Sequence, residues 1–280
     1  MAWCFLLVNL LVILLASRLR FAGRGLEYAS PICLSPQAWW WVIGACAALA
    51  AIAAAVGRRR LRDRRARRAL LELAVVFPPF FAFEWGMLPP LQRRWFDWAI
   101  MAGFVLLIAL LVLAERRSLA ERGLTGRNFV PAARALAVPT AIMVAAPIAA
   151  AFVVGTDFEP GRMARQALTY PAYALLQLLA FQVFLVWRLR RLSGWAATVA
   201  VSAGMFALMH WPNGIVMAAC AAGAAVWTVV YLRRPNVYAL ALSMALAVTS
   251  FANALPRERV LKNLRTGPIY IERMLEREHG

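Results

Sequence analysis

The sequence has few of the residues that soluble enzymes use for solubility and for chemistry. Only 16% of its 280 residues are charged, and it contains two histidines and four cysteines. The cysteines form no CxxC pair and no cysteine–histidine pattern. This spacing argues against a disulfide framework and against a cysteine-based zinc site. The sequence therefore predicts no metal site, and it identifies no cofactor.

Lysine is nearly absent as well, because Lys262 is the only one and the remaining positive charge comes from arginine. The formal net charge of +18 by itself suggests a nucleic-acid-binding protein. The arginines, however, stand in short clusters between apolar runs, with no nucleic-acid-binding motif beside them. Such clusters are typical of membrane proteins, in which they set the topology. We therefore expect no nucleic-acid partner.

Apolar residues make up 63% of the chain, and the mean hydropathy is +0.66. Soluble domains contain about 45–50% apolar residues. A run of about 20 apolar residues is long enough to cross the hydrocarbon core of a bilayer. We therefore predict an all-α protein, a polytopic transmembrane helix bundle with about nine spans surrounded by the lipid bilayer. The expected spans are Trp3–Ala16, Ala38–Val56, Ala69–Pro90, Trp98–Ala114, Leu136–Val154, Leu168–Trp187, Trp195–His210, Gly214–Leu232 and Val237–Leu255.

The arginine clusters predict the orientation. Four loops carry them, between expected spans two and three, four and five, six and seven, and eight and nine. With nine spans these loops share one side, which the positive-inside rule makes cytoplasmic, together with the N-terminus. Arg18–Arg24 and the charged tail Arg257–Gly280 would then lie on the outer side, which fits this rule less well.

Several polar side chains lie inside the apolar runs, where they are costly and need a partner or a function. Gln177 and Gln182 lie in the expected sixth span, and Phe206 and His210 share one helical face near the end of the seventh. Glutamines in a span often bridge neighbouring helices, and a histidine at a span end is often interfacial. Glu84, in the third span, is expected at about the depth of His210. We hypothesise that these two share a pocket; alternatively, Glu84 hydrogen-bonds a neighbouring helix or extends to the interface.

Taken together, these residues resemble the CAAX protease and bacteriocin-processing family of intramembrane endopeptidases, also called the Abi family. Its signatures are EExxxR in one helix, FxxxH in the next, and a histidine followed four residues later by asparagine in the last. The second signature is intact as Phe206–His210. In the first, Gln177 and Gln182 stand at the positions of the first glutamate and the arginine. In the third, Met244 stands at the histidine position and Val248 at the asparagine position.

The segment Leu264–Tyr270 is similar to the MRVGPGY-type ending of a divergent bacterial branch of this family. The resemblance covers Pro131 to Tyr270 and implies an integral protein of the bacterial plasma membrane. It divides the chain into N-terminal transmembrane spans (1–130), family-like core helices (131–256) and a charged C-terminal tail (257–280).

The substitutions weaken the chemistry that the resemblance implies. The family's mechanism needs a carboxylate that takes a proton, and a glutamine amide does not titrate usefully. The sequence thus predicts an intramembrane endopeptidase homologue for membrane-proximal or lipidated peptides, with most acid–base positions substituted. The alternative is a non-catalytic membrane binding or accessory protein that uses the same bundle. The candidate catalytic residues are His210, Gln177, Gln182, Phe206 and Glu84.

Overall fold

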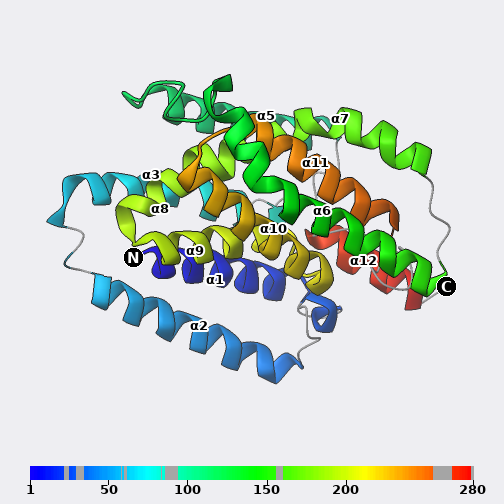
Figure 1. Cartoon of the computed structure of the whole chain (residues 1–280). Helices are drawn as coiled ribbons and strands as arrows, with labels where there is room; N and C mark the ends of the chain where they lie inside the picture. The colour runs from blue at the N-terminus through cyan, green and yellow to red at the C-terminus, as the bar shows by residue number, and fades with distance from the viewer. Residues whose placement is uncertain are drawn as a thin grey trace.

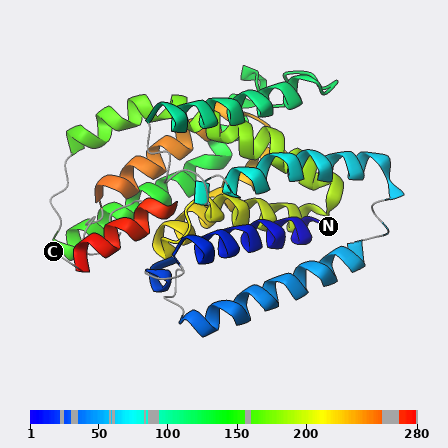
Figure 2. The ribbon, with the colours of Figure 1, turned by 180° about the vertical axis from the view of Figure 1, so that it is seen from behind.

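The structure, a computed structural model, is a bundle of helices with no strand among the described residues (Figures 1 and 2). It describes residues 1–21, 25–29, 35–57, 59, 62–82, 84–85, 94–155, 160–254 and 267–278. The helices are α1 (Ala2–Arg20), η1 (Leu26–Ala29), α2 (Pro36–Gly57), α3 (Arg64–Ala82), α5 (Arg94–Leu113), η4 (Gly126–Asn128), α6 (Phe129–Val154), α7 (Pro160–Leu178), η5 (Leu179–Val186), α8 (Trp187–Leu192), α9 (Trp195–Leu208), α10 (Gly214–Arg233), α11 (Val237–Ala254) and α12 (Gly267–Glu278).

The prediction of an all-α membrane bundle is confirmed, but nine spans is too high a number. Each expected span coincides with a helix, and among the described residues six helices are long and apolar enough to cross a membrane. Among the described residues, the apolar stretch Ala102–Leu113 of α5 and the helix α9 are shorter. α3 does not qualify because its first turns carry four arginines beside the apolar part. Hydropathy along the sequence therefore locates the helices correctly but does not show which of them cross fully.

The longest helical rod runs from Pro160 to Leu192 and changes its winding on the way. α7 leads directly into η5, an eight-residue π-helical segment, which leads into α8. π-helical turns inside α-helices are rare and frequently mark functional sites. Every side chain of η5 except that of its first residue is buried, so this segment lies at the centre of the bundle.

The core on the N-terminal side of the bundle is aromatic. Phe77 of α3 makes edge-to-face contacts with Phe5 of α1, Phe104 of α5 and Phe181 of η5, at ring-centroid distances of 5.8, 6.1 and 5.8 Å. Such pairs contribute about 0.5–1.5 kcal/mol each beyond the burial of their area. This cluster packs α1, α3 and α5 against η5.

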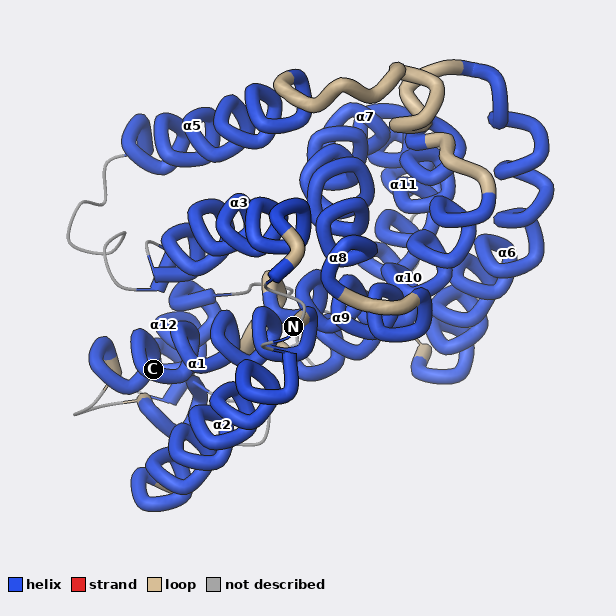
Figure 3. The backbone as a smooth tube through the Cα atoms, turned by 90° about the vertical axis from the view of Figure 1, so that its left-hand side faces the viewer, coloured by secondary structure: helices blue, strands red, loops and turns tan. Residues whose placement is uncertain are grey.

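The arginine-bearing loops meet at one end of the bundle, which Figure 3 shows facing the viewer. The loop after α5 pairs with the loop between α10 and α11: Val237 N–H donates to the carbonyl of Gly123 (3.0 Å), and the Asn236 amide donates to the carbonyl of Thr125 (2.8 Å). The Tyr231 hydroxyl donates to the carbonyl of Arg122 (3.0 Å). The sequence-based grouping of these loops thus agrees with the fold, and their cytoplasmic placement stays a prediction.

A buried ion cluster lies near the same end, and the sequence analysis missed it. Arg188 of α8 has 0% exposure, and its Nε lies 2.7 Å from Oε2 of Glu72. Its Nη2 lies 3.1 Å from Oε1 of Glu115, which follows α5. Arg68 pairs with the other oxygen of Glu72 at 2.7 Å. From the sequence, Arg188 is expected to be one of several loop arginines. In the fold it links α8 to α3 and to Glu115, which follows the end of α5.

Candidate functional site

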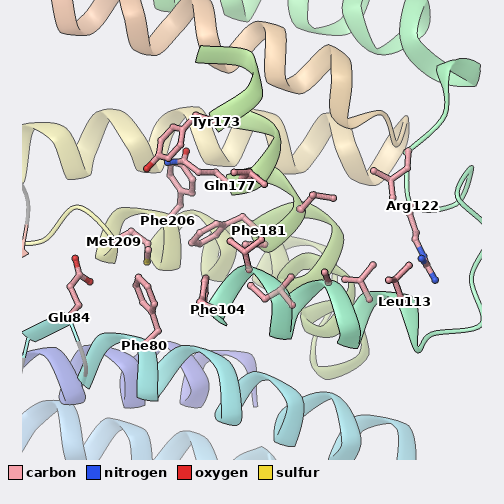
Figure 4. Close-up of a pocket in the computed structure, with 18 of the residues that line it drawn as sticks. Phe80, Glu84, Phe104, Leu113, Arg122, Tyr173, Gln177, Phe181, Phe206 and Met209 are labelled. Carbon is pink, nitrogen blue, oxygen red and sulfur yellow. The ribbon is translucent and has the colours of Figure 1, made fainter. Parts of the chain in front are cut away.

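A cavity of about 420 Å³ lies between the end of α3, α5, the α7–η5 junction and the end of α9 (Figure 4). Its middle is apolar, with Phe80, Phe104, Phe181 and a row of aliphatic side chains from α5. Its polar lining residues are few, and they lie toward the ends: Glu84, Tyr173, Gln177, His210 and Arg122. A mostly apolar cavity with a few polar groups is the usual form of a binding site for a small or extended ligand.

His210 is positioned by the way α9 ends. In a continuing helix the carbonyl of Phe206 would accept the backbone N–H of His210. Here that N–H donates instead to the carbonyl of Ala207 (2.8 Å), because the chain tightens before Pro212. The freed carbonyl of Phe206 lies 2.9 Å from His210 Nδ1. A carbonyl only accepts, so Nδ1 carries the hydrogen, and Nε2 of the neutral ring keeps its lone pair.

Phe206 fixes the imidazole from the side. The two rings lie 5.4 Å apart, and Phe206 packs edge-to-face on Phe181 at 4.8 Å and on Trp227 at 6.1 Å. Phe206 is itself nearly fully buried. The FxxxH pair therefore works as a unit, in which the phenylalanine supplies both a packing surface and a carbonyl that sets the tautomer of the histidine.

The structure brings Glu84 and His210 to the walls of the same cavity, as hypothesised from the sequence. Glu84 lies just beyond the end of α3, and no described residue forms an ion pair or a hydrogen bond with its carboxyl group. The bridging role considered for Glu84 therefore has no partner in the part of the chain that the structure describes. Gln177 also lines the cavity, and its buried Oε1 accepts no hydrogen bond from those residues.

Gln182 does not join this group. It is 1% exposed, and its amide donates to the Thr228 hydroxyl (3.2 Å), which donates to Ser202 (3.2 Å). These bonds tie η5 to α10 and α9, which is the helix-bridging role that glutamines in spans often have. The position that the resemblance assigns to the family's arginine is thus structural here.

The last span also lies apart from the cavity. None of the described residues of α11 lines it, and Met244 is buried at 1% exposure in helix packing. The polar residues near the end of α11 face α7, where Asn253 donates to Oε1 of Gln166 (2.7 Å). The helix at the position of the third family signature therefore does not line this cavity with Gln177 and His210, because α11 packs between α6 and α7.

Arg122 stands at the opposite end of the cavity from Glu84, as Figure 4 shows. It is 3% exposed, and its Nη2 donates to the carbonyl of Glu115 (2.7 Å). Its buried Nε donates to no described residue. Buried polar groups without a partner are rare in proteins. Gln177 Oε1 and Arg122 Nε are two such groups on the cavity lining, and together with the half-buried Glu84 carboxyl they point to a ligand or to bound water.

The described residues contain no group of three His, Cys, Asp or Glu side chains close enough to share a metal ion. The cavity offers one imidazole and one carboxylate. The arrangement thus places three polar groups around one apolar cavity: the Glu84 carboxylate as a proton acceptor, His210 Nε2 as a second acceptor, and the Gln177 amide.

A comparison with protein families finds one match, for residues 166–249, to the Rce1-like family, described as type II CAAX prenyl endopeptidase Rce1-like. This match confirms the resemblance to CAAX proteases, and it includes the glutamines, Phe206 and His210. A comparison with curated proteins and with solved structures finds no match. Glu84 and Arg122 lie outside the matched segment and enter the cavity only through the fold.

Proposed function

We propose that this chain, whose core segment belongs to the CAAX protease family, is an intramembrane endopeptidase in which Glu84 supplies the missing carboxylate. The family signature has glutamine where a proton acceptor is needed. The observation that supports the proposal is that Glu84, from outside the family segment, lines the same cavity as His210 and Gln177.

The chemistry assigned to these residues is hydrolysis of a peptide bond. Glu84 takes a proton from a water molecule while the water oxygen forms a bond with the peptide carbonyl carbon. His210 Nε2 accepts a hydrogen bond from the same water, and the Gln177 amide donates to the carbonyl oxygen as negative charge develops there. The bond from carbon to nitrogen then breaks, and Glu84 returns the proton to the departing nitrogen.

The substrate class follows from the lining. The aromatic and aliphatic middle of the cavity suits an apolar chain, and the matched family is described as a CAAX prenyl endopeptidase. We therefore infer a lipidated or membrane-proximal peptide, with its apolar chain between Glu84 and Arg122. The enzyme would stand in a bacterial plasma membrane with its arginine-bearing loops and its N-terminus in the cytoplasm.

The test is cleavage of a prenylated peptide by the purified protein in lipid nanodiscs, with and without a chelator. Glu84→Gln and His210→Ala are each expected to lower the rate by about 10²- to 10⁴-fold, the usual contribution of a general acid–base group. Glu276→Gln is the matched control, because Glu276 is exposed and pairs only with Arg273 on α12. Equal rates for all three variants would contradict the assignment.

The runner-up function is a non-catalytic binding or accessory protein for a membrane partner. It is favoured by Gln177, which stands at the family's glutamate position and cannot hold a proton. The same nanodiscs separate the two functions through equilibrium binding of the labelled peptide. Binding without cleavage, unchanged in Glu84→Gln, identifies the binding protein, and absence of binding contradicts both functions.

A further inference from the structure

The C-terminal helix α12 (Gly267–Glu278) lies against the bundle (Figures 1 and 2). Its first residue lies beside Glu84, which lines the cavity. Ile271 is fully buried and Tyr270 nearly so, whereas the helix exposes charged side chains elsewhere. Its later turn contacts the chain after α1, where a Cβ on Gly25 would lie 2.9 Å from the Leu275 side chain. α12 is thus packed against the protein along its length.

The first residue of α12 lies between the two chain segments that carry the candidate catalytic groups. The backbone N–H of Gly267 donates to the carbonyl of Trp211, the residue that follows His210, at 2.6 Å. Gly267 has a left-handed backbone, with φ of +63°, and a Cβ there would lie 3.1 Å from Oε1 of Glu84. Any other residue would bring its Cβ closer to the Glu84 carboxylate than an ordinary van der Waals contact, so the carboxylate would have to shift.

A second contact ties α12 to the residue that follows Glu84. Arg20, at the end of α1, forms an ion pair with Glu272 of α12 (2.6 Å) and donates from Nη1 to the carbonyl of Trp85 (3.4 Å). The Arg20 side chain is mostly buried, so this geometry is held on several sides. α12 is therefore joined to Trp211 by its backbone and, through Arg20, to Trp85.

An amphipathic helix that only covers the membrane interface would need an apolar face and a charged face, and nothing more. The hydrogen bond to Trp211, the space left for Glu84 and the link to Trp85 are specific to the cavity rim. These contacts fix the positions of Trp211 and Trp85, the residues that follow His210 and Glu84, relative to each other.

We propose that α12 is a positioning element of the site: Gly267 and the Arg20–Glu272 pair hold the Glu84 carboxylate in place relative to His210. The inference rests on the proposed roles of Glu84 and His210. It gives a function to the Gly-Pro segment of the tail, Gly267–Pro268, which the hydrolytic chemistry does not use. The tail is then part of the active site although it lies outside the family segment.

The experiment compares Gly267→Ala with Gly155→Ala, which is a close control. Both glycines have a left-handed backbone, so both variants carry the same backbone penalty, but a Cβ at Gly155 meets nothing within 4 Å. The chain has two histidines, so a His279→Asn background leaves His210 as the single histidine signal in NMR of histidine-labelled protein. Gly267→Ala is expected to move this signal and to lower kcat by roughly 10- to 100-fold with little change in KM. Gly155→Ala is expected to change neither.

Two further variants show whether the effect passes through Glu84. In a Glu84→Ala background, Gly267→Ala should move the histidine signal no further, because the carboxylate that it displaces is gone. Glu272→Gln, at a half-exposed position, removes the ion pair with little risk to folding and should move the signal in part. It also serves as the test if Gly267→Ala does not fold.

An unchanged histidine signal in both Gly267→Ala and Glu272→Gln would overturn the positioning role, whatever the cleavage rates. A moved signal in a protein that cleaves no peptide would instead leave the positioning role standing and overturn the proposed function. The two failures are therefore distinguishable.

Discussion

Two carboxylates twelve residues apart on the same stretch of chain have opposite surroundings. Glu72, on α3, is held by Arg68 and by the fully buried Arg188. Glu84, just beyond the end of α3, has no such partner among the described residues and faces a cavity. A buried acid with two arginines has its charge compensated and serves packing, whereas a half-buried acid that lines a cavity without a described partner is available to a ligand.

The same contrast holds for the amides and for the basic residues. Gln182 donates to Thr228 inside the bundle, whereas Gln177 lines the cavity, although the Oε1 atoms of both glutamines accept nothing from the described residues. Arg188 bonds two carboxylates, but the Nε of Arg122 has no described partner. Residue type therefore does not separate the two kinds of group in this bundle, and their place at the cavity or in the packed interior does.

The largest loss of stability is expected from breaking the ion cluster of Arg188, Glu72 and Glu115. Arg188→Met leaves Glu115 buried without its cation and Glu72 with only the more exposed Arg68, which should lower the free energy of unfolding by about 3–5 kcal/mol. The measurement is denaturant or thermal unfolding of the purified protein in micelles. Arg190→Met, which removes an exposed arginine from the same helix, is the control. Equal stabilities of the two variants would show that the ion cluster is not structural.

The next largest effect is the difference in stability between variants of the two carboxylates. Glu72→Gln should lower stability by roughly 1–3 kcal/mol, because the amide cannot compensate Arg188. Glu84→Gln should leave stability unchanged or higher, since it removes an unpaired buried acid. Unfolding of both variants under the same conditions checks this. A larger loss for Glu84→Gln than for Glu72→Gln would mean that Glu84 is structural.

A smaller effect separates the two glutamines. Gln182→Leu removes the bond to Thr228 and should lower stability by about 1 kcal/mol, in line with other hydrogen bonds between membrane helices. Gln177→Leu should change stability less and should weaken the binding of the labelled peptide. Stability and peptide binding measured on both variants give the comparison, and weaker binding in Gln182→Leu alone would reverse the assignments.

The smallest effect concerns a carboxylate that is paired but exposed, in the loop after α5. The backbone N–H and the hydroxyl of Ser118 donate to Glu121, and these bonds hold the pKa of the Glu121 carboxyl below its ordinary value. A lowered pKa in the folded state contributes stability above the ordinary pKa of glutamate, and this is lost as the pH falls through the lowered value. Ser118→Ala should raise the pKa toward the ordinary value, as NMR titration of the carboxyl would show. An unchanged pKa would mean that the backbone N–H of Ser118, which this variant keeps, sets it without the hydroxyl.

Much of the fold was readable from the sequence because membrane helices require long apolar runs. Each expected span is a helix in the structure. The number of spans was wrong because length and hydropathy treat α3 and α9 as equal to longer helices, although the arginines of α3 and the short length of α9 set them apart. The ion pair between Arg188 and Glu72 depends on how the helices pack, and hydropathy along the sequence does not predict helix packing.

The candidate site was readable only in part. The FxxxH spacing identified Phe206 and His210, and an acid inside an apolar run pointed to Glu84. Arg122 gave no such signal, because in the sequence it is one arginine among many in a loop. Gln182 was placed in the site by its position in a family signature, yet its side chain turns toward Thr228, and no spacing rule shows this in advance.

The π-helical segment η5 separates two functions of a single rod. Before it stands Gln177 on the cavity wall, and after it stands Arg188 in the ion cluster. Loss of one residue inside Leu179–Val186 would turn everything downstream by about 100° around the axis. Arg188 would then swing toward lipid while Gln177 stayed in place. The segment thus sets the angle between the half of the rod that lines the cavity and the half that carries Arg188.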